Sequence, residues 1–205
     1  MRALTARQQR LARLLDLNAP IEHREGVEQW TPLMIAALEG HIEVVTLLTN
    51  RGSDLEARNT NGQTALMKAS FEGHLAVVQV LVERKLKRKA EIETRSNKGS
   101  NALMYASQCG HLAVVQYLAS KGSSISTTAN DGTDACLGAA VFGFPDVVLF
   151  LISKGGDPRV KNQLNQSALT HFGLFATPRP SPKDCLLYTS PSPRDRTRSR
   201  MPSSA

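Results

Sequence analysis

The sequence is poor in cysteine and has no long apolar run, and each shortage excludes a class of protein. Its three cysteines, Cys109, Cys136 and Cys185, are too few and odd in number for a disulfide framework. Together with the lack of a secretory signal, this favours a reducing compartment: the cytoplasm, with the nucleus as an alternative. No stretch of about 18 apolar residues occurs, so we expect no membrane-spanning helix.

Signatures of catalysis and cofactor binding are also missing. No glycine-rich phosphate loop follows a strand, no G-x-S-x-G motif is present, and the acidic residues are scattered. Three of the five histidines, His41, His74 and His111, occupy one position of the repeat described next, so they cannot converge on one metal ion. We therefore expect no enzyme, no metal and no cofactor.

What the sequence does contain is an internal repeat. Its copies are marked by glycines at spacings of 33, 37 and 33 residues, Gly40, Gly73, Gly110 and Gly143. In the second copy, Leu66, Ala69 and Ser70 follow the spacing of one helical face, and Gly73 can end that helix in the left-handed conformation. A second helical face follows, with Val77, Val78, Leu81 and Val82. Such units bury their apolar faces only by stacking, which predicts a solenoid.

The repeated motifs resemble those of the ankyrin repeat family. The resemblance rests on the "TPL" of Thr31–Leu33, the "GQTAL" of Gly62–Leu66 and the Gly-His pairs at 40/41, 73/74 and 110/111. It implies an all-α fold: an ankyrin-repeat solenoid of stacked helix-turn-helix units with short hairpin loops. Proteins of this family usually bind other proteins.

The resemblance covers about residues 11–175 and suggests domain boundaries. Residues 28–161 would hold four repeats, residues 162–176 a truncated fifth repeat, and residues 1–27 a partial or capping repeat. In the capping repeat, Leu11, Leu14 and Leu15 would belong to a second helix. The run "MRALTARQQRLARLL", with four arginines and no acid, is also typical of a mitochondrial transit peptide, and that alternative stays open.

The copies depart from the family pattern in two places. The residue after the "TPL" leucine, often histidine in the family, is apolar here, so the polar link of that histidine is expected to be lost: Met34, Met67, Met104 and Leu137. In the fourth copy Phe144 and Pro145 replace the histidine and the residue after it, and Pro145 suits the first turn of a helix.

The cysteines of the repeats are expected to be free thiols without a role. Cys136 takes the place of a core leucine, so we expect it to pack as a small hydrophobe. Cys109 comes just before the glycine at the end of a first helix, where we expect it to be accessible.

The resemblance also implies where a partner binds, because the family uses its hairpin tips and the exposed face of its first helices. The matching tip residues are Trp30, Thr60, Asn61, Gln63, Asn97, Lys98, Ser100, Asn130, Asp131 and Thr133. The matching helix residues are Ile35, Leu38, Lys68, Phe71, Glu72, Tyr105, Gln108, Cys109, Val141 and Phe142. Aromatic side chains dominate interface energies, so Trp30, Phe71, Tyr105 and Phe142 are the expected anchors. Alternatively, Leu38, Phe71 and Phe142 are half-buried between repeats.

The segment "ERKLKRKAEIE", residues 83–93, contains the four-residue insertion that lengthens one period to 37. Four residues are about one helical turn, and the glycine that ends the other second helices is missing, so we expect a second helix one turn longer. The extension carries Arg84, Lys85, Lys87, Arg88 and Lys89. These cations suit a nuclear import signal, a patch for an acidic partner or nucleic acid, or simply a solvated helix end.

The last 21 residues, "CLLYTSPSPRDRTRSRMPSSA", resemble a conceptual translation of a transposase-type sequencing adapter in one reading frame. We therefore interpret residues 185–205 as an adapter artefact within a disordered tail, residues 177–205, and expect the natural protein to continue beyond Asp184. The alternative is a Ser/Pro/Arg regulatory tail. The artefact contributes four arginines against one aspartate to the net charge of +7.

The sequence thus predicts a monomeric, non-catalytic scaffold or adaptor module that binds one or more proteins. Nucleic acid is not the expected partner. The alternative is that these repeats are the targeting region of a larger, truncated enzyme, such as an ankyrin-containing kinase or a ubiquitin ligase component.

Overall fold

In the computed structural model, residues 22, 24, 26–87 and 92–172 are described. The helices in this part of the chain are α2 (Pro32–Glu39), α3 (Ile42–Asn50), α4 (Ala65–Glu72), α5 (Leu75–Lys87), α6 (Ala102–Gln108), α7 (Leu112–Ser120), α8 (Ala135–Val141), α9 (Pro145–Ser153) and α10 (Ala168–Phe172). They form antiparallel pairs, each with a first helix (α2, α4, α6, α8) and a second helix (α3, α5, α7, α9). The short helix α10 occupies the place of a fifth first helix.

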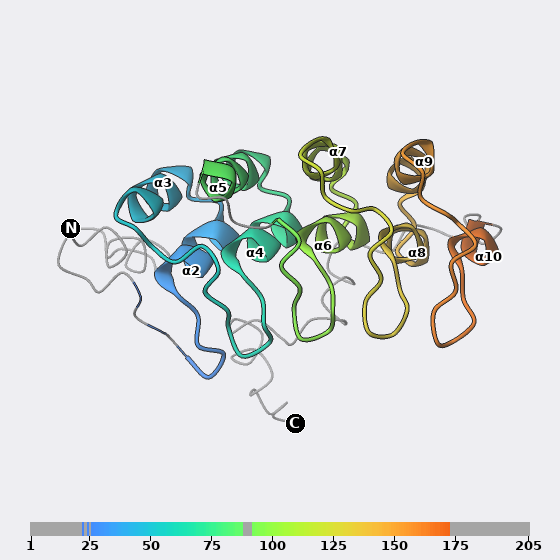
Figure 1. The fold of residues 1–205 in the computed structure, drawn as a ribbon, viewed down its shortest axis with the longest axis horizontal. Helices are drawn as coiled ribbons and strands as arrows, with labels where there is room; N and C mark the ends of the chain where they lie inside the picture. Colours follow the sequence, from blue (N-terminus) through green and yellow to red (C-terminus); the bar gives the residue numbers. More distant parts are fainter. Residues whose placement is uncertain (1–21, 23, 25, 88–91, 173–205) are drawn as a thin grey trace, which may run out of the picture.

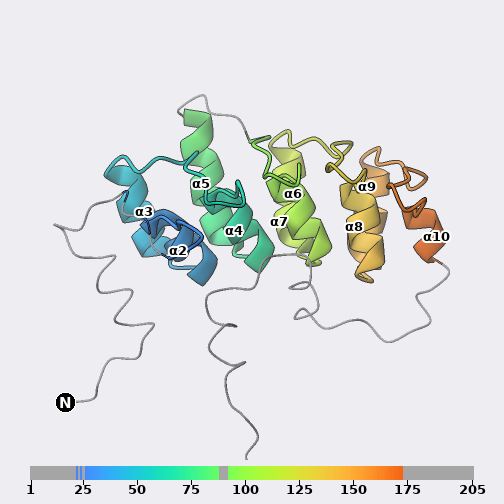
Figure 2. The ribbon, with the colours of Figure 1, turned by 90° about the horizontal axis from the view of Figure 1, so that it is seen from below.

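The pairs stack side by side along the long axis of the molecule (Figure 1). The first helices form one row, the second helices form another, and a hairpin loop projects from the side of the first helices between successive pairs. Seen from below, the first helices run alongside one another, and α5 extends farther than its neighbours (Figure 2). The all-α solenoid that the repeat predicted is confirmed.

Each first helix begins at a side-chain cap and ends at a turn. The N-cap oxygens accept hydrogen bonds from the backbone N–H three residues on, at 2.7–3.4 Å: Thr31, Thr64, Asn101 and Asp134. Gly40 and Gly73 end α2 and α4 in the left-handed conformation, with φ of 74° and 79°, as predicted for Gly73. These signals recur at the repeat period and limit the first helices to seven or eight residues.

The core lies between the two rows of helices. The apolar residues that stand in place of the family histidine are completely or almost completely buried: Met34, Met67, Met104 and Leu137. Cys136 is also fully buried in this core, which confirms that it packs as a small hydrophobe. Helix α9 begins at Pro145, as predicted, because the fixed φ of proline suits the first turn.

The insertion lengthens one helix, as predicted. Helix α5 has 13 residues, whereas α3, α7 and α9 have nine each. The four extra residues amount to about one helical turn, and they account for the longer period of this unit, 37 residues in place of 33. The solenoid therefore absorbs the insertion at one edge without changing the stacking of its first helices.

Histidines link neighbouring units. His74 Nε2 lies 3.0 Å from the carbonyl oxygen of Leu38, and His111 Nε2 lies 2.9 Å from that of Phe71. Each ring packs on the glycine that ends the preceding first helix. A Cβ on Gly73, for example, would lie 2.4 Å from the His111 ring. These histidines therefore lie at the helix junctions, and each makes a polar contact to the preceding unit.

Some predictions fall outside the described residues. They concern the helix with Leu11, Leu14 and Leu15, and the tail from residue 177 onward. Of the capping repeat, residues 22, 24, 26 and 27 are described. Two of them contact the next unit: Glu22 Oε1 accepts a hydrogen bond from Asp54 N, and Arg24 Nη1 donates one to Arg58 O.

Candidate functional site

Except for Trp30, which precedes α2, and Phe142, which follows α8, the predicted binding residues described below belong to α2, α4, α6, α8 or the hairpin turns at residues 59–63, 96–100, 129–133 and 162–166. The surface that these helices and turns form is called the inner face below. The structure leaves these exposed or partly exposed: Leu38, Thr60, Asn61, Phe71, Glu72, Asn97, Lys98, Gln108, Asn130, Asp131 and Phe142. It buries these: Trp30, Ile35, Gln63, Lys68 and Tyr105. Leu38, Phe71 and Phe142 are half-buried, as the alternative interpretation had it.

Trp30 and Lys68 are buried because they contact each other. Lys68 Nζ lies 4.1 Å from the centroid of the Trp30 ring, and Trp30 Nε1 donates a hydrogen bond of 2.7 Å to Glu28 Oε2. Burial lowers the pKa of Lys68 to about 8, although the nearby carboxylates of Glu28 and Glu72 act in the opposite direction. Both side chains are thus used within the solenoid, and neither is an open aromatic or cationic anchor.

Tyr105 and Gln63 also use their polar groups internally. Gln63 Nε2 donates a hydrogen bond of 3.0 Å to the Tyr105 hydroxyl, which donates one of 3.4 Å to Ser96 Oγ. The rings of Phe71 and Tyr105 meet edge to face, with centroids 6.3 Å apart. This contact fixes Tyr105 as part of the floor of the inner face.

The hairpin tips are joined by a ladder of side-chain amides. Asn97 Nδ2 donates to the carbonyl oxygen of Thr60, Asn130 Nδ2 to that of Asn97, and Gln163 Nε2 to that of Asn130, at 2.9–3.0 Å. A parallel set of backbone bonds joins Asn97 N to Asn61 O and Asn130 N to Lys98 O. The exposed tips therefore have fixed positions relative to one another, which lowers the entropic cost of binding a partner across them.

Sequence reasoning missed a second ladder, made by arginines in the hairpin arms. Arg24 donates to the backbone oxygen of Arg58, Arg58 to that of Arg95, and Arg95 to that of Thr128. The signal was present in the sequence, because arginine recurs at 24, 58 and 95, in step with the repeat period. These guanidinium groups hold the arms together, so they support the tips and are not themselves the predicted contact residues.

A groove of about 360 Å³ opens on the inner face between two neighbouring hairpins and α6. Six of the predicted binding residues line it: Asn97, Lys98, Tyr105, Gln108, Asn130 and Asp131. Ser100 and Thr133, which the sequence also placed at the tips, and Ala129 complete its wall. The groove thus brings together residues from two hairpins and one helix that are up to 36 positions apart in the chain.

The groove coincides with an irregularity of the repeat at Gly138. This position of the first helix carries a side chain in the other units, namely Ile35, Lys68 and Tyr105, and sequence reasoning did not single it out. A Cβ at Gly138 would lie 2.8 Å from Gln108 Cγ, so Gln108 packs over the space that a side chain would fill. Because Gln108 lines the groove, the glycine helps to set its shape.

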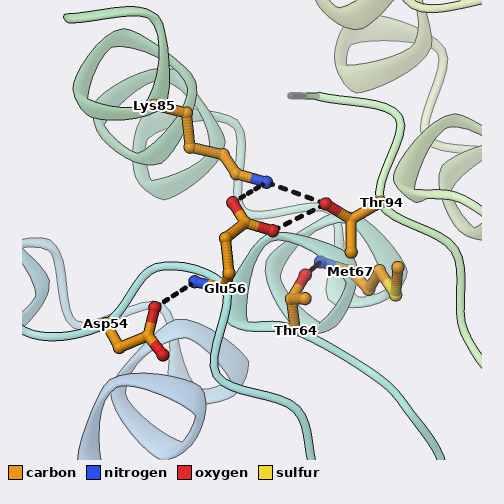
Figure 3. Close-up of polar contacts among 6 residues, drawn as sticks. All are labelled: Asp54, Glu56, Thr64, Met67, Lys85 and Thr94. Carbon is orange, nitrogen blue, oxygen red and sulfur yellow. Dashed lines mark hydrogen bonds and ion pairs between the residues drawn. The ribbon is translucent and has the colours of Figure 1, made fainter. Parts of the chain in front are cut away.

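The basic segment of the insertion is only partly available for binding, which corrects the sequence interpretation. Lys85 is almost completely buried, and its Nζ lies 2.5 Å from Glu56 Oε1 (Figure 3). Thr94 Oγ1 receives a hydrogen bond from Lys85 and donates one of 2.6 Å to Glu56 Oε2. Lys85 therefore acts as an internal tie between α5 and two hairpin arms. Arg84 is partly exposed, and Arg88 and Lys89 lie outside the described residues.

Cys109 is buried, so the expectation that it is accessible was wrong. The turn after α6 folds tightly, with His111 N donating a hydrogen bond of 2.9 Å to Ala106 O, and this closes the end of the helix. In the described part of the chain, no three His, Cys, Asp or Glu side chains are arranged to hold a metal ion. No helix there is long and apolar enough to cross a membrane.

Comparison with known proteins agrees with the repeat geometry. The pattern for ankyrin repeats in three copies matches residues 1–96, 54–131 and 84–162. Ankyrin repeat and SOCS box protein 11 from Homo sapiens is 41% identical over 53 residues, and the protein of the same name from Pongo abelii is 40% identical over the same length. Each match covers 26% of this chain and spans only 16% of the relative's length. Ankyrin repeats generally mediate protein–protein interactions. The stacked helix pairs, the glycine turns and these matches together show that the chain belongs to the ankyrin repeat family.

Proposed function

We propose that this chain is a protein-interaction scaffold without catalysis of its own, and that it binds a partner protein on the inner face. The observation that carries the proposal is the groove between the hairpins at 96–100 and 129–133, whose rims are fixed by the amide ladder. Its volume of about 360 Å³ falls in the range of sites that hold small ligands or a few side chains. A partner segment laid across the tips would place side chains in it.

The buried members of the predicted set take an indirect role in this proposal. Tyr105 lines the groove, and the buried contact between Lys68 and Trp30 supports the inner face at the first two units. The contact residues proper are then the exposed or partly exposed ones, chiefly Asn97, Gln108 and Asn130 in the groove and Glu72 and Phe142 elsewhere on the inner face. The whole set stays a prediction until a partner is bound.

A random dodecapeptide library displayed on phage and selected against the immobilised 205-residue chain tests the proposal. We expect the enriched peptides to bind in the groove, so that Gln108→Ala weakens them by about fivefold or more. Gln116→Ala is the matched control, because Gln116 is an exposed glutamine on α7, outside the inner face. Peptides that respond equally to both variants, or no enrichment at all, would contradict the proposal.

A second candidate is that these repeats are the targeting region of a larger protein that carries its own catalytic or ligase-recruiting part. The observation in its favour is the name of the relatives, which couples ankyrin repeats with a SOCS box, and the small share of their length that the match covers. The full-length transcript decides this. A further domain encoded after the fifth repeat supports the candidate, and a stop codon there rules it out.

A further inference from the structure

The chemistry of the groove indicates which side chain it accepts. Asp131 lies at the tip of the hairpin at 129–133, exposed, and lines the groove. One of its oxygens, Oδ1, accepts a hydrogen bond of 2.9 Å from Thr133 N within the turn. Among the described residues, no donor to its second oxygen is found. A carboxylate with a free oxygen on a fixed tip is a ready acceptor for a cationic donor.

The other rim carries the opposite charge. Lys98 occupies the same repeat position as Asp131, one hairpin earlier, and also lines the groove. Lys98 also takes part in an interaction within the structure. Its ammonium would repel a cation in the groove, so the structure makes an unusual prediction: removing this charge should strengthen the binding of a cation, and removing that of Asp131 should weaken it.

The floor suits a flat group. Tyr105 is held in place by Gln63 and Ser96, and the side chain of Gln108 packs against Gly138. The guanidinium of arginine is planar, stacks on aromatic rings and amide planes, and pairs with a carboxylate through two donors. The ammonium of lysine is not planar and does not pair with a carboxylate through two fixed donors.

Two carboxylates lie at the surface of the helices that form the inner face. Glu72 is exposed on α4, and Glu39 is partly exposed at the same repeat position on α2. The one lysine of the predicted helix face, Lys68, is buried against Trp30. This balance favours a partner segment with positive charge and disfavours the phosphates of nucleic acid.

We propose that the groove binds an arginine side chain of an extended peptide segment of the partner, with the guanidinium paired to Asp131 and lying over Tyr105 and Gln108. This inference rests on the proposed function, since it names the side chain that anchors the partner in the same groove. An acidic or purely apolar segment would leave the Asp131 carboxylate desolvated and unpaired.

The peptides selected from the dodecapeptide library provide the test, with synthetic copies measured by fluorescence anisotropy against the full chain. We expect one arginine shared among them, whose replacement by alanine weakens binding by about tenfold and by lysine about threefold. Asp131→Asn should weaken the arginine peptide about as much as the alanine peptide replacement does, and the two changes together should cost little more than either alone. Lys98→Gln should strengthen binding about twofold.

Asp157→Asn is the matched control, because Asp157 makes the same turn hydrogen bond, 2.9 Å from Arg159 N, at a place that does not line the groove. It should leave binding unchanged. If Gln108→Ala weakens peptides that need no arginine, the proposed function stands and this inference falls. If arginine matters equally on wild type and Asp131→Asn, the pairing is wrong. If no peptide is enriched, both proposals fail.

Discussion

Lys85 Nζ lies 2.5 Å from Glu56 Oε1, and this ion pair ties the extra turn of α5 to the hairpin arm before α4. The side chain of Lys85 is 1% exposed and that of Glu56 is 39% exposed. The ammonium therefore needs the carboxylate as its charge partner, whereas the carboxylate is also stabilised by solvent. The two residues are 29 positions apart, in neighbouring units. The insertion is therefore fastened inside the solenoid by a charge that the sequence alone would assign to the surface.

This asymmetry gives the first prediction. Glu56→Gln leaves the buried ammonium without its counter-charge and should lower the free energy of unfolding by about 2 kcal/mol. Lys85→Met removes the buried charge itself and leaves Glu56 with Thr94 and solvent, so it should cost less than about 1 kcal/mol. Urea unfolding followed by circular dichroism measures both. A larger loss for Lys85→Met than for Glu56→Gln would overturn this description of the pair.

A second prediction concerns two glycines with similar backbones and different surroundings. Gly73 has φ +79° and Gly52 has φ +93°, so alanine at either position costs about 1 kcal/mol or more in backbone strain. At Gly73 the new Cβ would also lie 2.4 Å from the His111 ring, whereas nothing lies within 4 Å of it at Gly52. Gly73→Ala should therefore cost about 3 kcal/mol in the same unfolding measurement. Equal losses would show that the histidine does not pack on the glycine.

The third prediction is a pH dependence of stability. Burial lowers the pKa of His111 below its ordinary value of 6.5; the contact with Phe71 O opposes this, and His74 adds to it. Because the folded state prefers the neutral ring, the unfolded chain binds more protons as the pH falls through about 6.5. The contribution to stability is fully present above that pH and is lost as the pH falls toward the lowered pKa.

The variant His111→Phe isolates this effect. The fourth unit already has Phe144 at the equivalent position, packed on Gly110 as His111 packs on Gly73. We expect melting curves of the variant at pH 7 and pH 5 to differ less than those of the wild type. An unchanged difference would assign the pH dependence to other groups.

Thiol reactivity gives a fourth prediction. Burial raises the pKa of Cys136 to about 12, with smaller contributions from Asp134 and Asp157, and Cys109 is buried as well. Since the thiolate is the reactive form, neither should react with an aromatic disulfide reagent in the folded protein. In a Cys185→Ser background, two thiols should appear only after denaturation. A fast-reacting thiol in the folded variant would contradict the burial of Cys109 or Cys136.

The fold was predictable because its signals are local and periodic. The caps Thr31 and Thr64, the turn glycine Gly73 and the four-residue insertion each act within one unit, and each could be recognised from spacing alone. The family followed from the same motifs. Local signals also placed Pro145 and Cys136 correctly.

The site was less predictable because its contacts cross between units. Nothing near Lys85 in the sequence points to Glu56, and nothing near Trp30 points to Lys68. Lys85 was assigned to the surface from local composition, and Lys68 from the family motif. Gly138 was not predicted to affect the site, because the effect of its missing side chain depends on Gln108 from the preceding unit, which packs against it. The arginines at 24, 58 and 95 recur in the sequence, but the backbone oxygens that they bind lie in neighbouring hairpin arms and are not indicated by the spacing.

The central claim, that a partner binds the inner face at the groove, is tested most directly by NMR shift mapping. Amide resonances of the full chain would be recorded with and without a peptide selected from the dodecapeptide library. The largest changes should fall on Asn97, Tyr105, Gln108 and Asn130, with α7 and α9 little affected. Changes concentrated on the second helices, with those four residues unmoved, would contradict it.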